Sequence, residues 1–178
     1  GTDMYLEWYL REKESGQKSL EERVVELLAE QNYTVTTAES CTGGLIAGTI
    51  VNAAGASEVL NEGYITYSNG AKERLVGVSH ETLERFGAVS EQTAREMAEG
   101  AARAAGADAA LSATGIAGPG GGTEEKPVGL VYIGCTLNGK TEVKECRFDG
   151  NRMENRLHTV RTALEMLRSM LTGQAGLL

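Results

Sequence analysis

Residues 33–53 read YTVTTAESCTGGLIAGTIVNA, and this stretch decides the fold of the chain. Residues 33–38 form a short run rich in β-branched side chains, which predicts a strand. Residues 39–44 are small and polar and predict a turn, and residues 45–53 carry apolar side chains at the spacing of a helix. A strand that passes through a tight turn into a helix is typical of α/β proteins.

The same alternation continues on both sides of this stretch. Further helices are expected at 19–31, 72–77 and 90–105 and from residue 152 onward, and further strands at 63–67, 108–112, 130–137 and 142–148. Asn138-Gly139 lies between the last two strands and predicts a hairpin. Because helices and strands alternate early and a hairpin comes late, we predict an α/β domain, a three-layer α/β/α sandwich with a mixed sheet.

The chain of 178 residues is long enough for one domain with a real core, which we expect at residues 19–172. Residues 1–18 are expected to be a tag, a linker or a short helix, and residues 173–178 a tail. The net charge is −8 and no Lys/Arg run stands out, which argues against a nucleic-acid groove. One or two arginines can still hold a small anion in an acidic protein.

Cysteine, histidine and apolar patterns exclude several other classes. Three cysteines without regular spacing and two distant histidines argue against a disulfide framework or a zinc site, so no metal ligands are predicted. The sequence has no signal peptide and no apolar run long enough to span a bilayer. We therefore expect a cytoplasmic protein without a membrane partner.

The turn at residues 39–44 is the first candidate site, because open α/β sheets bind ligands where a strand ends. The helix that follows offers unpaired N–H groups and a partial positive charge, which suit an oxyanion or a phosphate. Ser40 is the candidate nucleophile. Two alternatives stay open: Ser40 or Thr42 caps the helix, and Cys41 is either a nucleophile or a small buried side chain.

A serine nucleophile needs a base, and Lys72 is the candidate because histidines are so few. A lysine accepts a proton only when it is neutral, and burial favours that form by lowering its pKa from about 10.4. Tyr67, on the strand expected before Lys72, could tune such a pair. The alternatives are that Lys72 is a solvated residue of a first helical turn and that Tyr67 packs in the core.

The glycine-rich residues 115–122 and the start of the last helix are the remaining candidates. Glycines let backbone N–H groups approach a phosphate or a carboxamide closely, although the segment could equally be a flexible surface loop. Arg152 and Arg156 lie one turn apart at a helix start, where a positive charge opposes the helix dipole. A bound phosphate would explain them, and solvated surface arginines are the alternative.

Five strings in order carry a resemblance to a known family: TTAESCTGG (36–44), GYITYSNGAK (63–72), GAVS (87–90), ATGIAGPGGGTEEKPVG (113–129) and FDGNR (148–152). Together they resemble the C-terminal domain of the competence/damage-inducible CinA proteins. The same domain stands alone as the bacterial nicotinamide mononucleotide amidohydrolase. In longer family members a molybdopterin-biosynthesis-like domain precedes it, and the first 18 residues of this chain lie outside the match.

The resemblance implies an amidohydrolase that converts nicotinamide mononucleotide to nicotinate mononucleotide and ammonia in pyridine-nucleotide salvage, with no metal and no organic cofactor. The family's serine falls on Ser40 and its lysine on Lys72. A nearby tyrosine is placed at Tyr67, with Tyr64 on the same strand as the alternative. The substrate-binding positions that the resemblance and the turn imply are Cys41, Thr42, Gly43, Thr114, Gly115, Gly118, Gly120, Gly121 and Arg152.

Other interpretations remain. A non-catalytic module that binds and senses pyridine nucleotides would need neither a reactive Ser40 nor a neutral Lys72. A DNA-uptake or recombination partner would follow from the family's name, but the acidic composition disfavours contact with DNA. The N-terminal aromatics and the apolar stripe of the last helix predict a homodimer interface, the stripe being Leu157, Val160, Leu164, Leu167 and Leu171.

Overall fold

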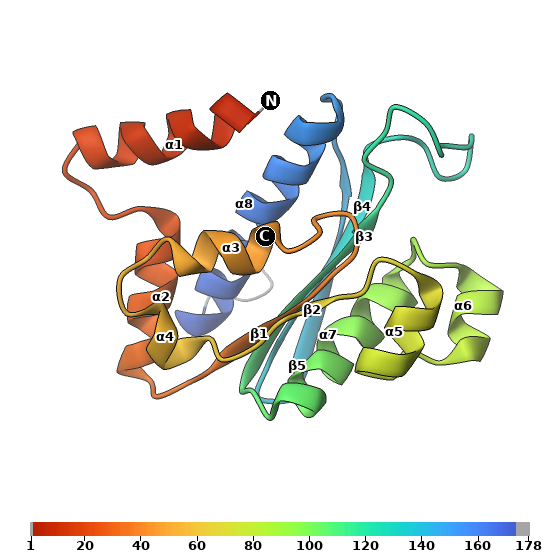
Figure 1. Cartoon of the computed structure of the whole chain (residues 1–178), viewed down its shortest axis with the longest axis horizontal. Coiled ribbons are helices and arrows are strands. Elements are labelled where there is room, and N and C mark those ends of the chain that lie inside the picture. Colours follow the sequence, from red (N-terminus) through yellow and green to blue (C-terminus); the bar gives the residue numbers. More distant parts are fainter. Residues whose placement is uncertain (1, 174–178) are drawn as a thin grey trace.

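A mixed sheet of five strands, in the order β2-β1-β3-β4-β5, forms the middle layer of the protein (Figure 1). The computed structural model describes residues 2–173, so the expected tail lies, apart from Gly173, outside the described residues. The strands are β1 (Val35–Glu39), β2 (Tyr64–Ile65), β3 (Ala109–Gly115), β4 (Leu130–Leu137) and β5 (Lys140–Arg147). Strand β1 is parallel to both of its neighbours, whereas β3, β4 and β5 pair antiparallel.

Helices cover both faces of this sheet (Figure 1). On one face lie α2 (Leu20–Glu30), α3 (Leu45–Val51), α4 (Ala56–Val59) and α8 (Arg152–Leu171), and on the other lie α5 (Asn69–Val76), α6 (His80–Phe86) and α7 (Glu91–Ala105). Helix α1 (Thr2–Glu14) contacts α8. The three-layer fold with a mixed sheet that the sequence predicts is therefore confirmed.

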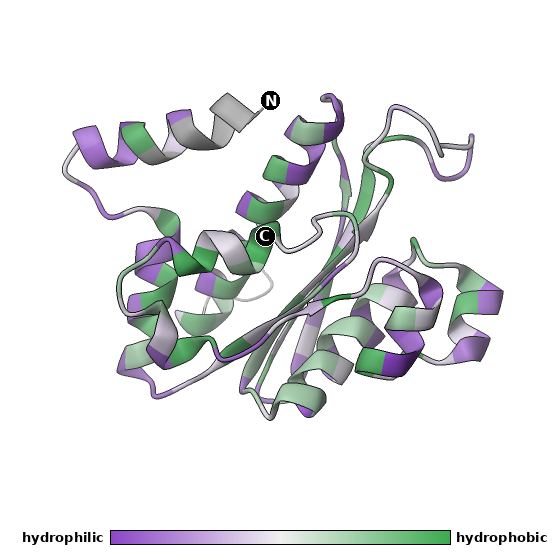
Figure 2. Cartoon of the chain, in the orientation of Figure 1, coloured by the Kyte–Doolittle hydropathy of each residue, from purple (hydrophilic) through white to green (hydrophobic). Residues whose placement is uncertain are grey.

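Strand β3 runs through the centre, and its side chains alternate between the two layers. Leu111 and Ala113 belong to the larger apolar cluster, which includes residues of α2, α3 and α8. Ala110 belongs to a smaller cluster with Met97 of α7. Figure 2 shows the same distribution, with hydrophobic residues along the sheet and on the inner faces of the helices. Strand β3 is thus enclosed on both faces.

Two elements near the candidate site differ from the sequence prediction. The strand expected at 63–67 is only two residues long, and it pairs with β1 alone at the edge of the sheet. The next helix begins at Asn69 rather than at Lys72, because the Ser68 hydroxyl accepts from the Ala71 amide and caps it. Lys72 therefore lies one turn inside α5. The short helices α4 and α6 have no counterpart in the sequence prediction.

Helix α8 carries the apolar stripe that suggested a dimer interface. Its stripe residues are buried within the chain, against α2 and the sheet: Leu157, Val160, Leu164, Leu167 and Leu171. Trp8 of α1 lies edge-on to His158, with ring centroids 5.3 Å apart, and Arg161 bonds Glu12 at 2.8 Å. The stripe and Trp8 are used inside one chain, so the predicted homodimer would have to form through another surface.

The described residues are also informative about membrane-spanning helices, disulfides and metal-binding clusters. No helix within residues 2–173 is long and apolar enough to cross a membrane. The cysteines Cys41, Cys135 and Cys146 are buried and free of disulfides. Within the same residues, no group of three His, Cys, Asp or Glu side chains could hold a metal ion.

Candidate active site

The carboxyl ends of β2, β1 and β3 meet at one edge of the sheet, because these strands run in the same direction. After β1 the chain turns to α3 on one face, and after β2 it turns to α5 on the other (Figure 1). A crevice forms where neighbouring connections diverge in this way, and open α/β sheets bind ligands there. Ser40 directly follows β1 and Lys72 lies in α5, so the two residues flank this crevice.

Ser40 and Lys72 are in direct contact. The Nζ atom of Lys72 lies 3.1 Å from Oγ of Ser40. It also donates to the carbonyl oxygens of Thr66 at 2.9 Å and Tyr67 at 3.4 Å. Lys72 is only 1% exposed, and the amine bonds no carboxylate among the described residues. Lys72 is therefore not the solvated lysine that the sequence left open.

The surroundings of Lys72 favour the neutral amine. Burial lowers the pKa of Lys72 from its ordinary value of 10.5, while the nearby Cys41 thiol acts more weakly in the opposite direction. The three oxygens around Nζ suit both protonation states. An ammonium donates to all three, whereas a neutral amine donates to the two carbonyls and accepts the proton of Ser40. A lysine base beside a serine nucleophile needs this arrangement.

A carboxylate rather than a hydroxyl caps helix α3. Glu39, the last residue of β1, is 1% exposed, and its Oε1 accepts from the amides of Gly44 at 3.2 Å and Ile46 at 2.8 Å. Its Oε2 accepts from the Ala47 amide at 3.0 Å. The prediction that these amides are free for a phosphate or an oxyanion is therefore wrong. Neither hydroxyl that the sequence offered as a cap fills that role.

Two amides of the turn remain without an oxygen acceptor. The Ser40 amide donates to the carbonyl of Ala113 at 3.0 Å, and the Gly43 amide donates to the carbonyl of Ser40 at 3.1 Å. The amides of Cys41 and Thr42 donate to no oxygen within residues 2–173, although both residues are buried, and the Cys41 amide contacts only its own thiol. Buried amides are almost always paired, so these two N–H groups beside Ser40 are candidate oxyanion donors.

Cys41 is a less suitable nucleophile than its neighbour Ser40. Burial raises the pKa of the Cys41 thiol to about 12, and the charge of Arg156 opposes this shift without overcoming it. The thiolate is the nucleophilic form of cysteine, and it is scarce at neutral pH when the pKa is so high. The structure favours Cys41 as a small buried side chain.

Tyr67 and Arg152 meet at the mouth of the site. The side chain of Tyr67 is 63% exposed, so the alternative of a core tyrosine is wrong. Its hydroxyl lies 3.4 Å from Nη2 of Arg152, and the contact of Tyr67 with Lys72 is made by its carbonyl oxygen. Arg152 also donates to the carbonyl of Gly118 at 2.9 Å. Within the described range Arg152 forms no salt bridge, so its charge is available to an anion.

Arg156, one turn further along α8, contacts the backbone of the serine turn. Its Nε donates to the carbonyl of Cys41 at 2.9 Å, and its Nη2 donates to the carbonyl of Thr42 at 3.1 Å. Its side chain is half-buried rather than solvated. Arg156 thus binds protein backbone, which neither the phosphate nor the surface interpretation of the sequence anticipated.

The site forms a cavity of about 200 Å³. Its walls come from the three strand ends, the start of α5, the link before α7, the glycine-rich segment and α8: Ser40, Cys41, Tyr67, Asn69, Lys72, Ala88, Val89, Thr114, Gly115, Ala117 and Arg152. This volume lies below the roughly 300–1,000 Å³ typical of pockets that bury a whole drug-sized ligand. The cavity therefore suits one end of a nucleotide rather than the whole molecule.

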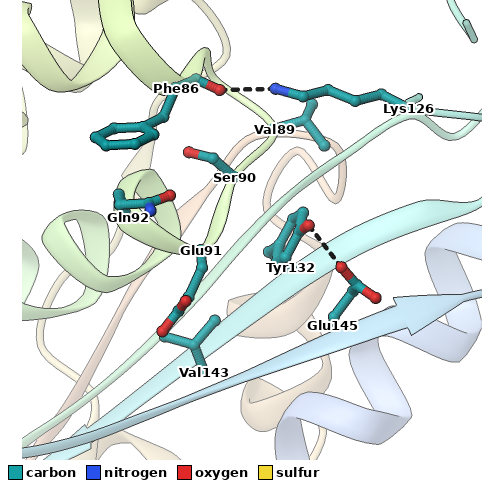
Figure 3. Close-up of a pocket in the computed structure, with 9 residues that line it drawn as sticks. All are labelled: Phe86, Val89, Ser90, Glu91, Gln92, Lys126, Tyr132, Val143 and Glu145. Atoms are coloured by element: carbon teal, nitrogen blue, oxygen red, sulfur yellow. Dashed lines mark hydrogen bonds between the residues drawn. The ribbon is translucent and has the colours of Figure 1, made fainter.

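A larger pocket of about 600 Å³ shares Val89 with this cavity but contains neither Ser40 nor Lys72. Figure 3 shows Lys126 stretched to the carbonyl oxygen of Phe86 along one side. The opposite wall carries Glu145, which accepts from Tyr132, and Glu91 lies nearby (Figure 3). The two carboxylates outnumber the single ammonium of Lys126 on its walls, which makes this pocket less favourable for a phosphate. The contact between Ser40 and Lys72, and not pocket size, identifies the candidate active site.

Comparison with known proteins identifies the family. The model of the CinA C-terminal domain matches residues 17–171. The chain belongs to this family. A CinA-like protein of Kosmotoga olearia is 57% identical over 156 residues, which cover 88% of this chain and 38% of that protein. A putative competence-damage inducible protein of Clostridium perfringens is 55% identical, with the same shares of 88% and 38%. The chain thus spans about 38% of the length of these curated relatives.

Solved structures of the CinA family have the same fold. The competence/damage inducible protein CihA from Agrobacterium tumefaciens aligns with a TM-score of 0.83 at 51% identity, covering 86% of this chain and 93% of that one. A CinA superfamily protein from Escherichia coli aligns with a TM-score of 0.81 at 33% identity, covering 86% and 88%. The fold is therefore kept at much lower identity than the curated relatives show.

Many of the residues predicted from the sequence come together in this CinA domain. Seven line the cavity: Ser40, Cys41, Tyr67, Lys72, Thr114, Gly115 and Arg152. Thr42 and Gly43 lie in the adjoining turn, and Gly118 offers its carbonyl to Arg152. Gly120 and Gly121 do not line the cavity. Tyr64, the alternative to Tyr67, does not line it either and donates to Glu62.

Two predicted binding residues have structural contacts of their own. The hydroxyl of Thr114 donates to the carbonyl of Ala88 at 2.8 Å. A Cβ at Gly115 would lie 2.7 Å from the carbonyl oxygen of Leu130, so this glycine permits the close approach of β3 and β4. The start of the glycine-rich segment is held by α8, since Asn155 donates to the carbonyl of Ala117 at 3.0 Å. The segment is thus anchored at this end.

Sequence reasoning gave no role to Asn69, Ala88, Val89 and Ala117, which also line the cavity. Ala88 and Val89 belong to the GAVS string that supported the family resemblance, so that string carried a usable signal. Asn69 follows Ser68, and a serine is a common helix cap. Recognising Ser68 as the cap would have predicted that the helix begins at Asn69, beside the cavity. The role of Glu39 is harder to foresee, because it depends on contacts across the turn.

Proposed function

We propose that the chain is an amidohydrolase that converts nicotinamide mononucleotide to nicotinate mononucleotide and ammonia in pyridine-nucleotide salvage. The observation that carries this proposal is the buried contact of 3.1 Å between Lys72 Nζ and Ser40 Oγ. A buried amine with a lowered pKa and no carboxylate partner is suited to remove the proton of a serine. Membership of the CinA family, together with the resemblance described above, supports this substrate.

The reaction balances with the residues of this chain and one water. Neutral Lys72 takes the proton of Ser40, and Oγ forms a bond to the carboxamide carbon. The oxygen of the tetrahedral intermediate carries a negative charge, which the free amides of Cys41 and Thr42 stabilise. The C–N bond then breaks, and the proton on Lys72 goes to the departing nitrogen, which leaves as ammonia. Water hydrolyses the resulting ester with Lys72 again as the base, which releases the carboxylate and restores Ser40.

The charges around the cavity favour an anionic nucleotide with its phosphate at the mouth. The nicotinamide end fits the small cavity at Ser40, and Arg152 and the exposed ring of Tyr67 lie where the ribose phosphate would leave it. On the other side, Glu91 and Glu145 of the larger pocket would repel a phosphate. We therefore place the phosphate beside Arg152.

Ammonia release from nicotinamide mononucleotide tests this function. The wild type, Ser40→Ala and Lys72→Ala are compared, with Ser57→Ala and Lys140→Ala as controls because both side chains are exposed and remote from the cavity. We expect release by the wild type and both controls, and loss in the two site variants. A folded wild type that binds the nucleotide but releases no ammonia would instead support a pyridine-nucleotide sensor.

The curated relatives are much longer than this chain, so its cellular role is a separate proposal. Since the chain spans about 38% of their length, we propose that it acts as the amidase part of a longer competence/damage-inducible protein. We also keep the prediction that the protein forms a homodimer. Its predicted partner is a small-molecule substrate and not a nucleic acid. Light scattering at micromolar concentration tests the dimer, and a monomer would refute it.

A further inference from the structure

We propose that Glu39 and Arg156 are positioning residues that hold the turn at residues 40–43 in the shape that oxyanion stabilisation requires. The proposal rests on the amidohydrolase function above, because that reaction creates the oxyanion. Neither side chain lines the cavity, so both act through the backbone of the turn. They reach the turn from different elements, Glu39 from the end of β1 and Arg156 from α8.

Glu39 fixes both ends of the turn. It immediately precedes Ser40, and its carboxylate reaches forward to the amides of Gly44, Ile46 and Ala47. The backbone between residues 39 and 47 is thereby closed into a loop that contains the nucleophile. The same contacts occupy the amides of the first turn of α3, which would otherwise compete for a negative charge. The amides that stay free are those beside Ser40.

Arg156 orients these free amides from the other side. In a trans peptide the carbonyl of one residue and the N–H of the next point in opposite directions. Arg156 draws the carbonyl of Cys41 toward α8, so the N–H of Thr42 points away from that helix. The carbonyl of Ser40 is held by the Gly43 amide, so the N–H of Cys41 points away from Gly43. The two free N–H groups are thus set by bonds that their own peptide groups make.

The two side chains also act on the turn electrostatically, in opposite senses. At Cys41 the positive charge of Arg156 favours the thiolate, whereas the negative charge of Glu39 disfavours it. Arg156 forms no salt bridge within the described part of the chain, so its charge is not cancelled by a bonded carboxylate. A positive charge bonded to the backbone of the turn also favours an oxyanion at the amides of Cys41 and Thr42.

A purely structural role would have a different signature. If Glu39 and Arg156 only stabilised the fold, their loss would lower the melting temperature and reduce the affinity for every ligand to the same extent. If they position the turn, their loss reduces the affinity for a ligand that resembles the tetrahedral intermediate. The affinity for a ligand that is bound through its phosphate stays the same. Two ligands of these kinds therefore separate the two roles.

The experiment compares Glu39→Gln, Arg156→Gln and Arg156→Lys with the wild type. Arg161→Gln is the control, because Arg161 lies on the same helix and bonds Glu12 instead of the turn. The first probe is pyridine-3-boronic acid, whose boron becomes tetrahedral when Ser40 adds to it, which boron NMR detects. The second is nicotinate mononucleotide. Calorimetry gives both affinities, and thermal melting identifies any variant that fails to fold.

We expect Arg156→Gln to weaken boronate binding by about 10–100-fold, with the affinity for nicotinate mononucleotide unchanged. The boronate affinity of Arg156→Lys should lie between those of Arg156→Gln and the wild type, and the boronate affinity of Arg161→Gln should equal that of the wild type. In the hydrolysis assay kcat should fall while KM stays the same. If Glu39→Gln does not fold, Arg156→Gln and Arg156→Lys still decide the outcome.

Three outcomes would overturn the proposal: unchanged boronate affinity in Arg156→Gln, an equal fall for both ligands, or a wild type that gives no tetrahedral boron signal. The boronate measurement does not depend on hydrolysis of nicotinamide mononucleotide, so it tests the turn separately from the proposed substrate. A wild type that forms the boronate adduct but leaves nicotinamide mononucleotide intact would contradict the proposed substrate and would leave the role of the turn in place.

Discussion

The Nζ atom of Lys72 and the Oγ atom of Ser40 lie 3.1 Å apart although 32 residues separate them in the chain. Their contact follows from the sheet, because Ser40 continues β1 and Lys72 lies in the helix after β2, which pairs in parallel with β1. Parallel strands deliver their carboxyl ends to the same edge. The predictions that follow concern this pair, the residues around it, two glycines in the helices α3 and α7, and strand β2.

The pH dependence of hydrolysis should report the protonation of Lys72. The pKa of Lys72 lies below 10.5 because of burial, and only the neutral amine acts as a base. We expect kcat/KM to rise with pH, with a midpoint below 10.5, and to level off above it. Lys72→Arg keeps the charge but cannot be deprotonated, so we expect a loss of about 10²–10⁴-fold and no such rise. A wild-type midpoint at or above 10.5 would contradict this assignment.

Cys41 should be chemically inert despite its place next to Ser40. Burial raises the pKa of its thiol to about 12, so little thiolate forms at pH 7–8. We expect iodoacetamide to leave the hydrolysis rate unchanged under native conditions, and Cys41→Ala to remain active. Mass spectrometry of the native and the unfolded protein checks that Cys41 is alkylated only after unfolding. Rapid inactivation with label on Cys41 would argue for a cysteine nucleophile.

Arg152 should recognise the phosphate rather than the reacting carboxamide. Its guanidinium has backbone and Tyr67 partners but no salt bridge within residues 2–173. Hydrogen bonds between charged groups contribute about 1.5–3 kcal/mol, so Arg152→Gln should lower kcat/KM for nicotinamide mononucleotide by about 10–150-fold. Nicotinamide riboside lacks the phosphate, and its kcat/KM should be the same in variant and wild type. An equal loss for both substrates would place Arg152 at the reacting end instead.

Two glycine substitutions in helices should have opposite effects on stability. A Cβ at Gly100 in α7 would lie 1.7 Å from the carbonyl oxygen of Val76, so Gly100→Ala should lower the free energy of unfolding by about 1–3 kcal/mol. Gly48 in α3 is exposed and has open space around it. Gly48→Ala should raise the same quantity by about 0.5–1 kcal/mol. Urea unfolding measures both, and a stabilising Gly100→Ala would refute the close packing of α5 and α7.

The sequence specified the fold and much of the site because both depend on local patterns. Strand and helix periodicity predicted the layers, and the strings around Ser40, Lys72 and Arg152 pointed to residues that do line one cavity. The roles of Glu39 and Arg156 escaped prediction for a physical reason. A carboxylate at a strand end and an arginine at a helix start resemble many surface residues, and their partners are backbone groups that only the folded turn creates.

The shortness of β2 has a consequence for heat sensitivity. This edge strand holds the Lys72 side of the crevice through a two-residue pairing, and the Thr66 amide beyond it donates to the carbonyl of Glu39 at 2.8 Å. Edge segments with few bonds open locally at a lower free energy than the core does. Such an opening would loosen the strand that leads into α5, while the other four strands stay intact. We therefore expect the proposed hydrolase activity to be lost on warming before the domain itself melts, and amide exchange at Thr66 to be faster than at the centre of β3.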